Sequence, residues 1–381
     1  MTDETSAKGL EGVVVAQTQL SYVDGQIGKL VYHGYPIEAL ARNASFEEVA
    51  YLLWHKKLPN KTELAALEEA LKENRALDDD LVGIMSCLPK DAHPMGVLRT
   101  AVSALGASDP EQEDPSPEAN LRKAIRLTAC FPTVVAAWGR IREGEAVVEP
   151  RDDLGHAANF MWMLHGEEAS EDAVRAVDAY LVMLADHGMN ASTFSARVTT
   201  GTQGDMYSAI TTACGTLKGP LHGGANEKVM QMLLEVESLD KAEAWFEQAR
   251  AEGRRLMGIG HRVYKVEDPR ATVLRDMSRD IAETSGDGKW LDIALRIEGL
   301  ARADQYFIER NLYANVDFYS AVALYAVGIP IDMFTPLFAM SRVAGWTAHV
   351  MEQWANNRLI RPRGDYVGPQ DQAWVPLDER D

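Results

Sequence analysis

Cysteine, basic charge and long apolar segments are all scarce in this chain, and each scarcity excludes a class of protein. The three cysteines (Cys87, Cys130 and Cys214) are an odd number in no metal-ligand spacing. They argue against a disulfide framework and fit a reducing cytoplasm. The formal net charge is −19 over 381 residues. This argues against nucleic acid as a partner, because binding it usually needs a basic face.

The sequence predicts neither a membrane span nor a secretion signal. The longest uncharged apolar run, Phe318–Ile331, contains Gly328 and Pro330 and is too short to cross a bilayer. Met1–Lys8 is polar and lacks the apolar stretch of a signal peptide. We therefore expect a cytoplasmic protein with no membrane partner.

Helical periodicity dominates the chain after residue 40. Ser45 and Glu48 have the spacing of a capping box, and an apolar stripe follows them. Further helix starts are predicted at Ser116-Pro117, Ser170 and Asp268-Pro269. Only residues 12–37, where glycines interrupt apolar alternation, suggest a small β-hairpin. The prediction is a mostly α fold, with a possible domain boundary near Gly219-Pro220.

Polar residues gather in three segments of an otherwise apolar context: Leu221–Gly224, Gly260–Arg270 and Asn315–Ser320. His222 precedes two glycines and a helical pattern, so we expect a neutral, hydrogen-bond-donating imidazole at a positive helix end. His261 follows Gly258 and Gly260, whose exposed N–H groups suit a phosphate or a carbonyl, although the dinucleotide fingerprint is absent. Asp317 precedes an apolar helix and fits its N-cap, a general base, or both roles together. Taken singly, each histidine also fits an ordinary surface or core position.

Several cationic side chains near these segments indicate an anionic ligand. Arg262, Lys265 and Arg270 form a local positive cluster in an acidic chain. Arg342 lies in an apolar helical pattern, where a guanidinium is unfavourable unless paired, so a ligand carboxylate is a reasonable partner. Arg361 flanks Pro362 near the C-terminus, and a planar guanidinium can bind both oxygens of a carboxylate.

Taken together, these residues resemble citrate synthase over nearly the whole chain. The resemblance runs from Gly28–Tyr35 to Arg361-Pro362-Arg363. Its most specific pieces, in chain order, are Gly219–Ala225, Gly258–Tyr264 and Val316–Ser320. It implies an all-α, two-domain homodimer of the short branch of the family, with the active site in the cleft. Residues 1–221 and 321–381 would form a large dimerisation domain, and residues 222–320 a small catalytic one.

The resemblance also implies an activity and a role for each candidate residue. Acetyl-CoA would condense with oxaloacetate and water to give citrate and CoA, through an enolate and citryl-CoA, in the tricarboxylic acid cycle. Asp317 would remove the methyl proton, His222 would stabilise the enolate, and His261 would polarise the oxaloacetate carbonyl. The residues expected to bind oxaloacetate are His187, Arg270, Arg342 and Arg361, the last from the partner subunit. Those expected to contact CoA are Leu256, Met257, Gly258, Ile259, Gly260, Arg262 and Lys265. Acetyl-CoA is then a co-substrate, and neither a metal nor a resident cofactor is expected.

Three other functions remain open from the residues themselves. A 2-methylcitrate synthase would use propionyl-CoA, and one methylene in a pocket is worth only about 1–3 kcal/mol of discrimination. A metal-dependent hydrolase would use the candidate histidines and Asp317 as ligands, but no close His-x-x-x-His pair supports it. A non-catalytic acyl-CoA-binding protein could keep the fold, although every candidate chemical residue is present.

The excess of carboxylates is either a general aid to solubility or an adaptation to concentrated salt. At 1 M salt the Debye length is about 3 Å, so repulsion among surface carboxylates fades. Under the second hypothesis, the free energy of unfolding measured with urea is larger in molar KCl than at low salt. Equal or greater stability at low salt contradicts the hypothesis.

Overall fold

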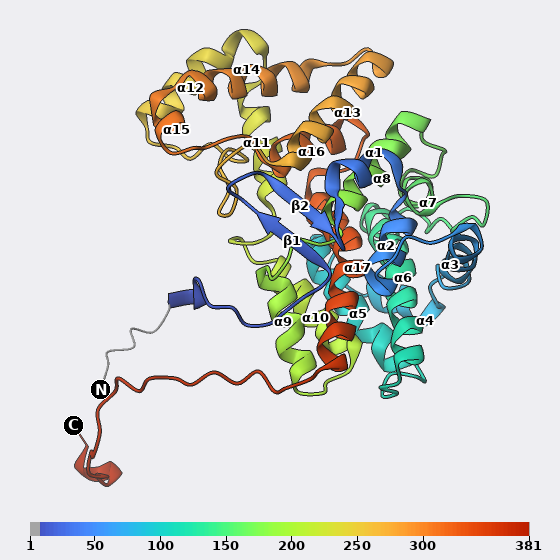
Figure 1. The fold of residues 1–381 in the computed structure, drawn as a ribbon, viewed down its shortest axis with the longest axis vertical. Helices are drawn as coiled ribbons and strands as arrows, with labels where there is room; N and C mark the ends of the chain where they lie inside the picture. Colours follow the sequence, from blue (N-terminus) through green and yellow to red (C-terminus); the bar gives the residue numbers. More distant parts are fainter. Residues whose placement is uncertain (1–7, 381) are drawn as a thin grey trace.

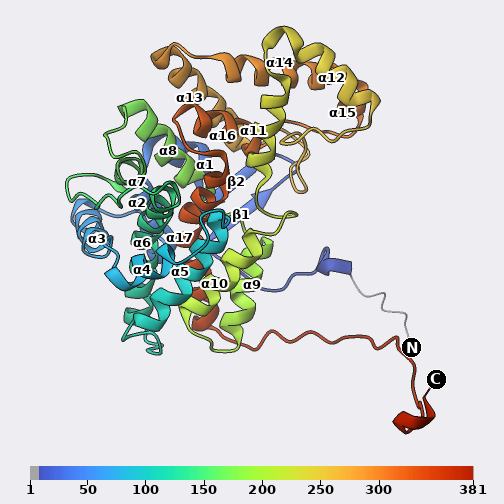
Figure 2. The ribbon, with the colours of Figure 1, turned by 180° about the vertical axis from the view of Figure 1, so that it is seen from behind.

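The computed structural model describes residues 8–380, which are predominantly helical (Figures 1 and 2). These residues form seventeen α-helices and one small antiparallel sheet, which confirms the predicted all-α class. Residues 1–7, on which most of the expectation about a signal peptide rests, lie outside the described part. Within residues 8–380, no helix is both long and apolar enough to span a bilayer.

The helical elements have the following bounds: η1 (Lys8–Leu10), α1 (Ile37–Asn43), α2 (Phe46–His55), α3 (Lys61–Glu73), α4 (Asp79–Ser86), α5 (Pro94–Ser108), α6 (Pro117–Glu143), α7 (His156–His165), α8 (Glu171–Leu184), α9 (Ala191–Gly201), α10 (Met206–Leu217), α11 (Ala225–Val236), η2 (Leu239–Lys241), α12 (Ala242–Ala251), α13 (Pro269–Ser285), α14 (Lys289–Ala303), α15 (Gln305–Glu309), α16 (Val316–Ala326), η3 (Ile331–Met333), α17 (Phe334–Ala355) and η4 (Leu377–Glu379). Helices α11 to α16 lie together at one end of the molecule, at the top of Figure 1.

The predicted hairpin is present and carries a third short strand. β1 (Ser21–Asp24) pairs antiparallel with β2 (Lys29–Tyr32), so that Ser21 lies opposite Tyr32. β2 then pairs with β3 (Tyr35–Pro36). The turn between β1 and β2 touches the loop that follows His261, because the backbone N–H of Lys265 donates to the carbonyl of Gly25 at 2.8 Å. The sheet therefore reaches the segment expected to bind substrates.

The helix starts follow the predicted capping chemistry, with one exception. Ser45 and Glu48 form the reciprocal capping box of α2. The N-caps of α6, α8 and α13 are Ser116, Ser170 and Asp268. The prediction that Asp317 might cap its helix is wrong: the cap of α16 is Asn315, whose Oδ1 accepts from the N–H of Asp317 at 2.9 Å. Asp317 lies in the first turn, so its carboxylate is not used for capping.

Helix α17 runs through the middle of the large group of helices (Figures 1 and 2). It packs against α2, α6, α8, α9 and α10, and its central side chains, including Arg342, Trp346 and His349, are buried. After α17 the chain leaves the body of the molecule. Residues 356–376 have no helix or strand and are mostly exposed, and Figure 1 shows them running away from α9.

Two helical glycines, one tightly packed and one exposed, should respond in opposite directions to substitution by alanine. A Cβ on Gly106 in α5 would lie 2.6 Å from the Cβ of Tyr207, whereas a Cβ on the exposed Gly83 in α4 would meet nothing within 4 Å. We expect Gly106→Ala to lower the free energy of unfolding by about 1–3 kcal/mol through overpacking. Gly83→Ala should raise it by about 0.5–1 kcal/mol, because alanine loses less backbone entropy in a helix. Urea unfolding of both variants checks the pair, and equal effects would contradict it.

Candidate functional site

The loop that carries His261 is fixed to the segment before α16. The N–H of Gly260 donates to the carbonyl of Tyr313 at 2.7 Å, and the N–H of Asn315 donates to the carbonyl of Gly258 at 2.9 Å. The side-chain amide of Asn315 also donates to the carbonyl of Gly260 at 2.9 Å. These bonds set the position of His261 relative to the start of α16. The sequence analysis identified this loop but not the part played by Asn315.

The His261 ring has a defined neutral tautomer. Its Nδ1 accepts from the backbone N–H groups of Val263 and Tyr264, at 3.0 and 3.1 Å. A nitrogen that accepts hydrogen bonds carries no proton, so in the neutral ring the proton is on Nε2. Burial, and then the positive charge of Arg270, lower the pKa of His261 to about 4. At neutral pH His261 is therefore a neutral donor.

His187 joins this cluster from the end of α8. Its Nε2 lies 3.1 Å from the hydroxyl of Tyr264, and its ring centroid is 5.7 Å from that of His261. Burial, followed by the nearby charge of Arg270, lowers its pKa well below the usual value. Two histidines that are distant in sequence thus meet beside one tyrosine, which the sequence analysis did not single out.

Arg270 is buried and paired within its own chain. Its guanidinium makes two hydrogen bonds to the carboxylate of Asp268, at 3.0 and 2.8 Å. The same carboxylate accepts from the N–H of Val316 at 3.1 Å, which connects the N-terminus of α13 to that of α16. Arg270 was expected to bind oxaloacetate as part of a local positive cluster. The structure shows that Asp268 takes two of its three nitrogens.

Asp317 lies in the first turn of α16, next to this pair. Burial raises the pKa of its carboxyl to about 6, even though the positive charge of Arg270 acts in the opposite direction. Its carboxylate oxygens accept no hydrogen bond from residues 8–380, whereas its backbone N–H donates to Asn315 and its backbone carbonyl accepts from the hydroxyl of Ser320. This side chain is ionised at neutral pH and is a stronger base than an ordinary aspartate.

His222 lies in the turn before α11 and contacts the first turn of α9. Its Nε2 is 2.8 Å from the hydroxyl of Ser192 and accepts from the N–H of the same residue at 3.3 Å. The proton of the neutral ring is therefore on Nδ1. Burial, and then Arg342, lower its pKa to about 4. The expected neutral state agrees with this shift, but the cause is burial and Arg342 rather than the helix end.

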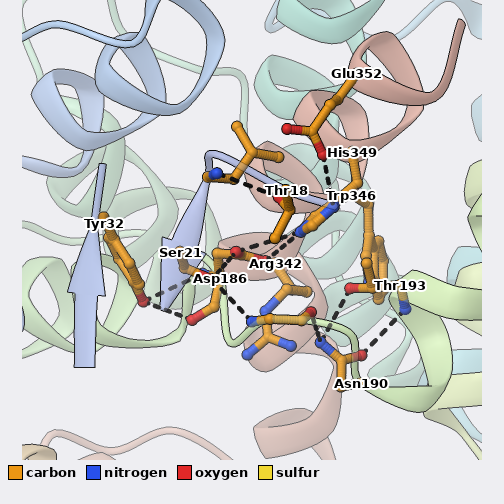
Figure 3. Close-up of polar contacts among 12 residues, drawn as sticks. Thr18, Ser21, Tyr32, Asp186, Asn190, Thr193, Arg342, Trp346, His349 and Glu352 are labelled. Atoms are coloured by element: carbon orange, nitrogen blue, oxygen red, sulfur yellow. Dashed lines mark hydrogen bonds and ion pairs between the residues drawn. The ribbon is translucent and has the colours of Figure 1, made fainter. Parts of the chain in front are cut away.

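Arg342 lies on α17, near Asp186 in Figure 3, and its charge acts on His222. Its side chain is only 1% exposed, its Nε donates to the carbonyl of Leu184 at 2.6 Å, and its guanidinium lies 4.7 Å from the ring centroid of Phe338. Burial lowers its pKa, and Asp186 is the largest opposing influence. Its two terminal nitrogens make no hydrogen bond to any described residue. They are thus available to bind a ligand carboxylate.

The remaining predicted residues divide into three groups. Arg262 and Lys265 are exposed on the loop after His261, as expected for contacts with a large ligand. Leu256 and Ile259 are 2% and 5% exposed, so their side chains are unavailable and only their backbone can serve CoA. Arg361 lies on the exposed tail beyond α17, and within this chain it is not brought to the other site residues.

The geometry gives no support to a metal-dependent hydrolase. Across residues 8–380, no group of three or more His, Cys, Asp or Glu side chains is arranged to hold a metal ion. His187 and His222 instead have hydroxyl groups as neighbours, those of Tyr264 and Ser192. Two cavities, of about 490 and 520 Å³, lie elsewhere and are lined by none of the predicted site residues.

Comparison with known proteins places this arrangement in a family. The family model described as citrate synthase, C-terminal domain, matches residues 9–363. The chain belongs to the citrate synthase family. It is 50% identical over 378 residues to the citrate synthase of Haloferax volcanii, with 98% of each chain covered. It is also 42% identical to a 2-methylcitrate synthase of Mycobacterium tuberculosis, over 96% of this chain and 91% of that one.

Solved citrate synthase structures have the same fold. The enzyme from Pyrobaculum aerophilum matches with a TM-score of 0.92 and 45% identity, over 98% of this chain and 95% of that one. The enzyme from Thermoplasma acidophilum matches with a TM-score of 0.91 and 32% identity, over 98% and 99% of the two chains. The latter structure is a ternary complex with carboxymethyl coenzyme A and oxaloacetate.

Proposed function

We propose that this chain condenses acetyl-CoA with oxaloacetate and water to form citrate and CoA, the reaction of citrate synthases, using His222, His261 and Asp317. The observation that carries the proposal is the protonation pattern of these three groups. Two imidazoles with pKa values of about 4 are neutral donors at pH 7, and one buried carboxylate with a pKa of about 6 is an ionised base. A carboxylate base beside neutral hydrogen-bond donors is one combination that performs carbon-acid chemistry without a metal.

Asp317 removes the proton from the methyl group of acetyl-CoA. The C–H electrons move into a carbon–carbon double bond as the thioester oxygen becomes an enolate oxygen. His222 donates the Nδ1–H hydrogen bond that stabilises this oxygen. A donor already positioned in a buried site stabilises the developing charge more than it stabilises the neutral thioester. Ser192 keeps the ring in the required tautomer by donating its backbone N–H to Nε2.

His261 acts on the second substrate. Its Nε2–H donates to the ketone oxygen of oxaloacetate, and the enolate carbon attacks the carbonyl carbon. The new alkoxide then takes up the Nε2 proton of His261, giving citryl-CoA; water returns a proton to the ring, and Asp317 releases the methyl proton to solvent to regenerate the base. Water hydrolyses the thioester to citrate and CoA. The two backbone donors to Nδ1 hold the imidazole in the orientation that this step requires.

Oxaloacetate is held by His187, Arg270, Arg342 and Arg361. The terminal nitrogens of Arg342 can bind a carboxylate as a pair, and Arg270 offers the one nitrogen that Asp268 does not use. The chain as a whole repels a dianion, because its formal net charge is −19. Short-range contacts inside the buried site must therefore outweigh the repulsion from the distant surface, which salt screens.

Coenzyme A lies against the backbone of residues 256–260 and the side chains of Arg262 and Lys265. In this proposal residues 222–320 form a small domain that closes on the large one, residues 1–221 and 321–381, once oxaloacetate is bound. Closure expels water and protects the thioester until condensation is complete. Acetyl-CoA is a co-substrate and no resident cofactor is needed. We assign the reaction to the tricarboxylic acid cycle in the cytoplasm.

Propionyl-CoA is the second candidate acyl donor. The 42% identity to a 2-methylcitrate synthase favours it as an alternative, since both reactions use the same condensation. The two donors differ by one methylene, for which discrimination is only about 10- to 200-fold. The ratio of kcat/KM for acetyl-CoA to that for propionyl-CoA, measured by thiol release, separates the two functions.

The role of Asp317 gives a direct kinetic test. We expect Asp317→Asn to fold and to bind oxaloacetate in calorimetry, and to lose turnover by on the order of 10²–10⁴ because the amide is not a base. In the wild type, kcat/KM should rise with pH through about 6, because only the ionised carboxylate accepts the proton, and then level off. Near-normal turnover of the variant would show that another group is the base.

Arg361 tests whether the active site is shared between two copies of the chain. The exposed tail at residues 356–376 supports a homodimer in which each Arg361 reaches the partner's site. We expect Asp317→Asn and Arg361→Ala each to be nearly inactive alone. After joint refolding, random pairing makes about half of the dimers mixed, and each mixed dimer has one site with both wild-type residues. Recovery of roughly a quarter of wild-type activity supports sharing. No recovery would place Arg361 in the site of its own chain.

A further inference from the structure

A buried polar network lies behind the proposed oxaloacetate site, and its centre is Asp186 (Figure 3). The carboxylate of Asp186 is fully buried. Its Oδ2 accepts from the hydroxyl of Ser21 at 2.5 Å, and its two oxygens lie 3.2 and 3.3 Å from Nε2 of His349. Tyr32 also belongs to the network, because its hydroxyl donates to the backbone carbonyl of Asp186 and accepts from the backbone N–H of Asp186. Neither catalysis nor the resemblance assigns a role to this network.

The far side of the network fixes the protonation of His349. Arg197, on α9, places Nη1 3.1 Å from Nδ1 of His349 and 2.8 Å from a carboxylate oxygen of Glu352. A guanidinium can only donate, so Nδ1 of His349 accepts and its Nε2 carries the proton toward Asp186. Burial alone would raise the pKa of Asp186, but His349, Arg342 and Ser21 together hold it below its usual value. Asp186 is therefore a buried anion.

This anion adjoins two of the proposed oxaloacetate ligands, His187 and Arg342. His187 is the next residue in the chain, and Ser21 ties the residues on either side of it by accepting from the N–H of Gly188 at 2.9 Å. Arg342 donates to the carbonyl of Leu184, two residues before Asp186, at 2.6 Å. Of the groups around Arg342, Asp186 contributes the largest favourable charge interaction.

We propose that Asp186, held by His349 and Ser21, is a positioning residue that orients His187 and Arg342 for oxaloacetate. The inference rests on the proposed role of these two residues in oxaloacetate binding. Asp186 supplies a fixed negative charge that stabilises the guanidinium of Arg342. The terminal nitrogens of Arg342 remain available to the substrate. Its short contacts also fix the backbone from which His187 projects.

Arg342 needs such a countercharge because its other contacts do not neutralise it. A carbonyl oxygen and the face of a phenyl ring hold the guanidinium in place, but neither carries a formal charge. A salt bridge directly to Arg342 would occupy the nitrogens that the substrate must reach. A carboxylate one step behind the site stabilises the cation without competing with the substrate. Arg270 differs, because Asp268 already occupies two of its nitrogens.

The test is Asp186→Asn, which keeps the size and one acceptor oxygen of the side chain but removes its charge. We expect the KM for oxaloacetate to rise about 10- to 100-fold, in line with the effect of misplaced binding groups. At saturating oxaloacetate, kcat and the KM for acetyl-CoA should change less than about threefold, because His222, His261 and Asp317 keep their contacts. A purely structural role would lower thermal stability without this split between the two substrates.

Asp178→Asn is the matched control. Asp178 lies on α8, the helix that leads to Asp186, and its carboxylate accepts a hydrogen bond from the backbone N–H of Phe46 at 3.1 Å. It touches none of the site residues, so we expect both KM values to be unchanged. If Asp186→Asn raises the KM for oxaloacetate no more than Asp178→Asn does, the inference is overturned.

Two substitutions of His349 keep the test decisive if Asp186→Asn does not fold. The amide of His349→Gln can still donate to Asp186 and should retain most of the oxaloacetate affinity, whereas His349→Leu cannot donate and should lose about tenfold or more. Equal KM values for the two variants would contradict the inference. Arg342→Ala separates it from the proposed function: an unchanged KM for oxaloacetate in that variant means the proposed site itself is wrong.

Discussion

Helix α17 touches the chain at residues 184–186 so closely that Gly345 has no room for a side chain. A Cβ at Gly345 would lie 2.1 Å from the carbonyl oxygen of Ala185 and 3.0 Å from Oδ1 of Asp186. This close approach brings one face of α17 onto three parts of the site. Arg342 faces the ligand region and His349 meets Asp186. Trp346 donates to the hydroxyl of Ser192, which in turn contacts His222.

Electrostatics in this molecule act on two length scales. The surface carries a large excess of carboxylates, whereas the site gathers Arg270 and Arg342 around histidines that their charge helps to keep neutral. The same burial that lowers the pKa of the imidazoles raises that of Asp317. A single physical cause, removal from water, thus favours neutral imidazoles and a more basic carboxylate in the same region.

Features that depend only on residues close together in the chain could be predicted from the sequence. The capping box at Ser45 and the glycine-broken hairpin act over a few residues, so the sequence alone indicates them. Other features depend on contacts between segments far apart in the chain. Asn315, which caps α16 in place of Asp317, is also held to the carbonyl of Gly260 at 2.9 Å, and Asp268 pairs with Arg270 while accepting from the N–H of Val316 at 3.1 Å.

Periodicity, capping residues and motif order are written along the chain, so the sequence alone was enough to predict the class of fold and to nominate the candidate reacting groups. The protonation and orientation of those groups came only with the folded structure. The tautomer of His261 comes from two backbone donors, the base strength of Asp317 from burial, and the role inferred for Asp186 from contacts with Ser21 and His349. The protonation and orientation of these side chains depend on which distant segments shield them from water and which offer them a hydrogen-bond donor. No single position in the sequence specifies those contacts.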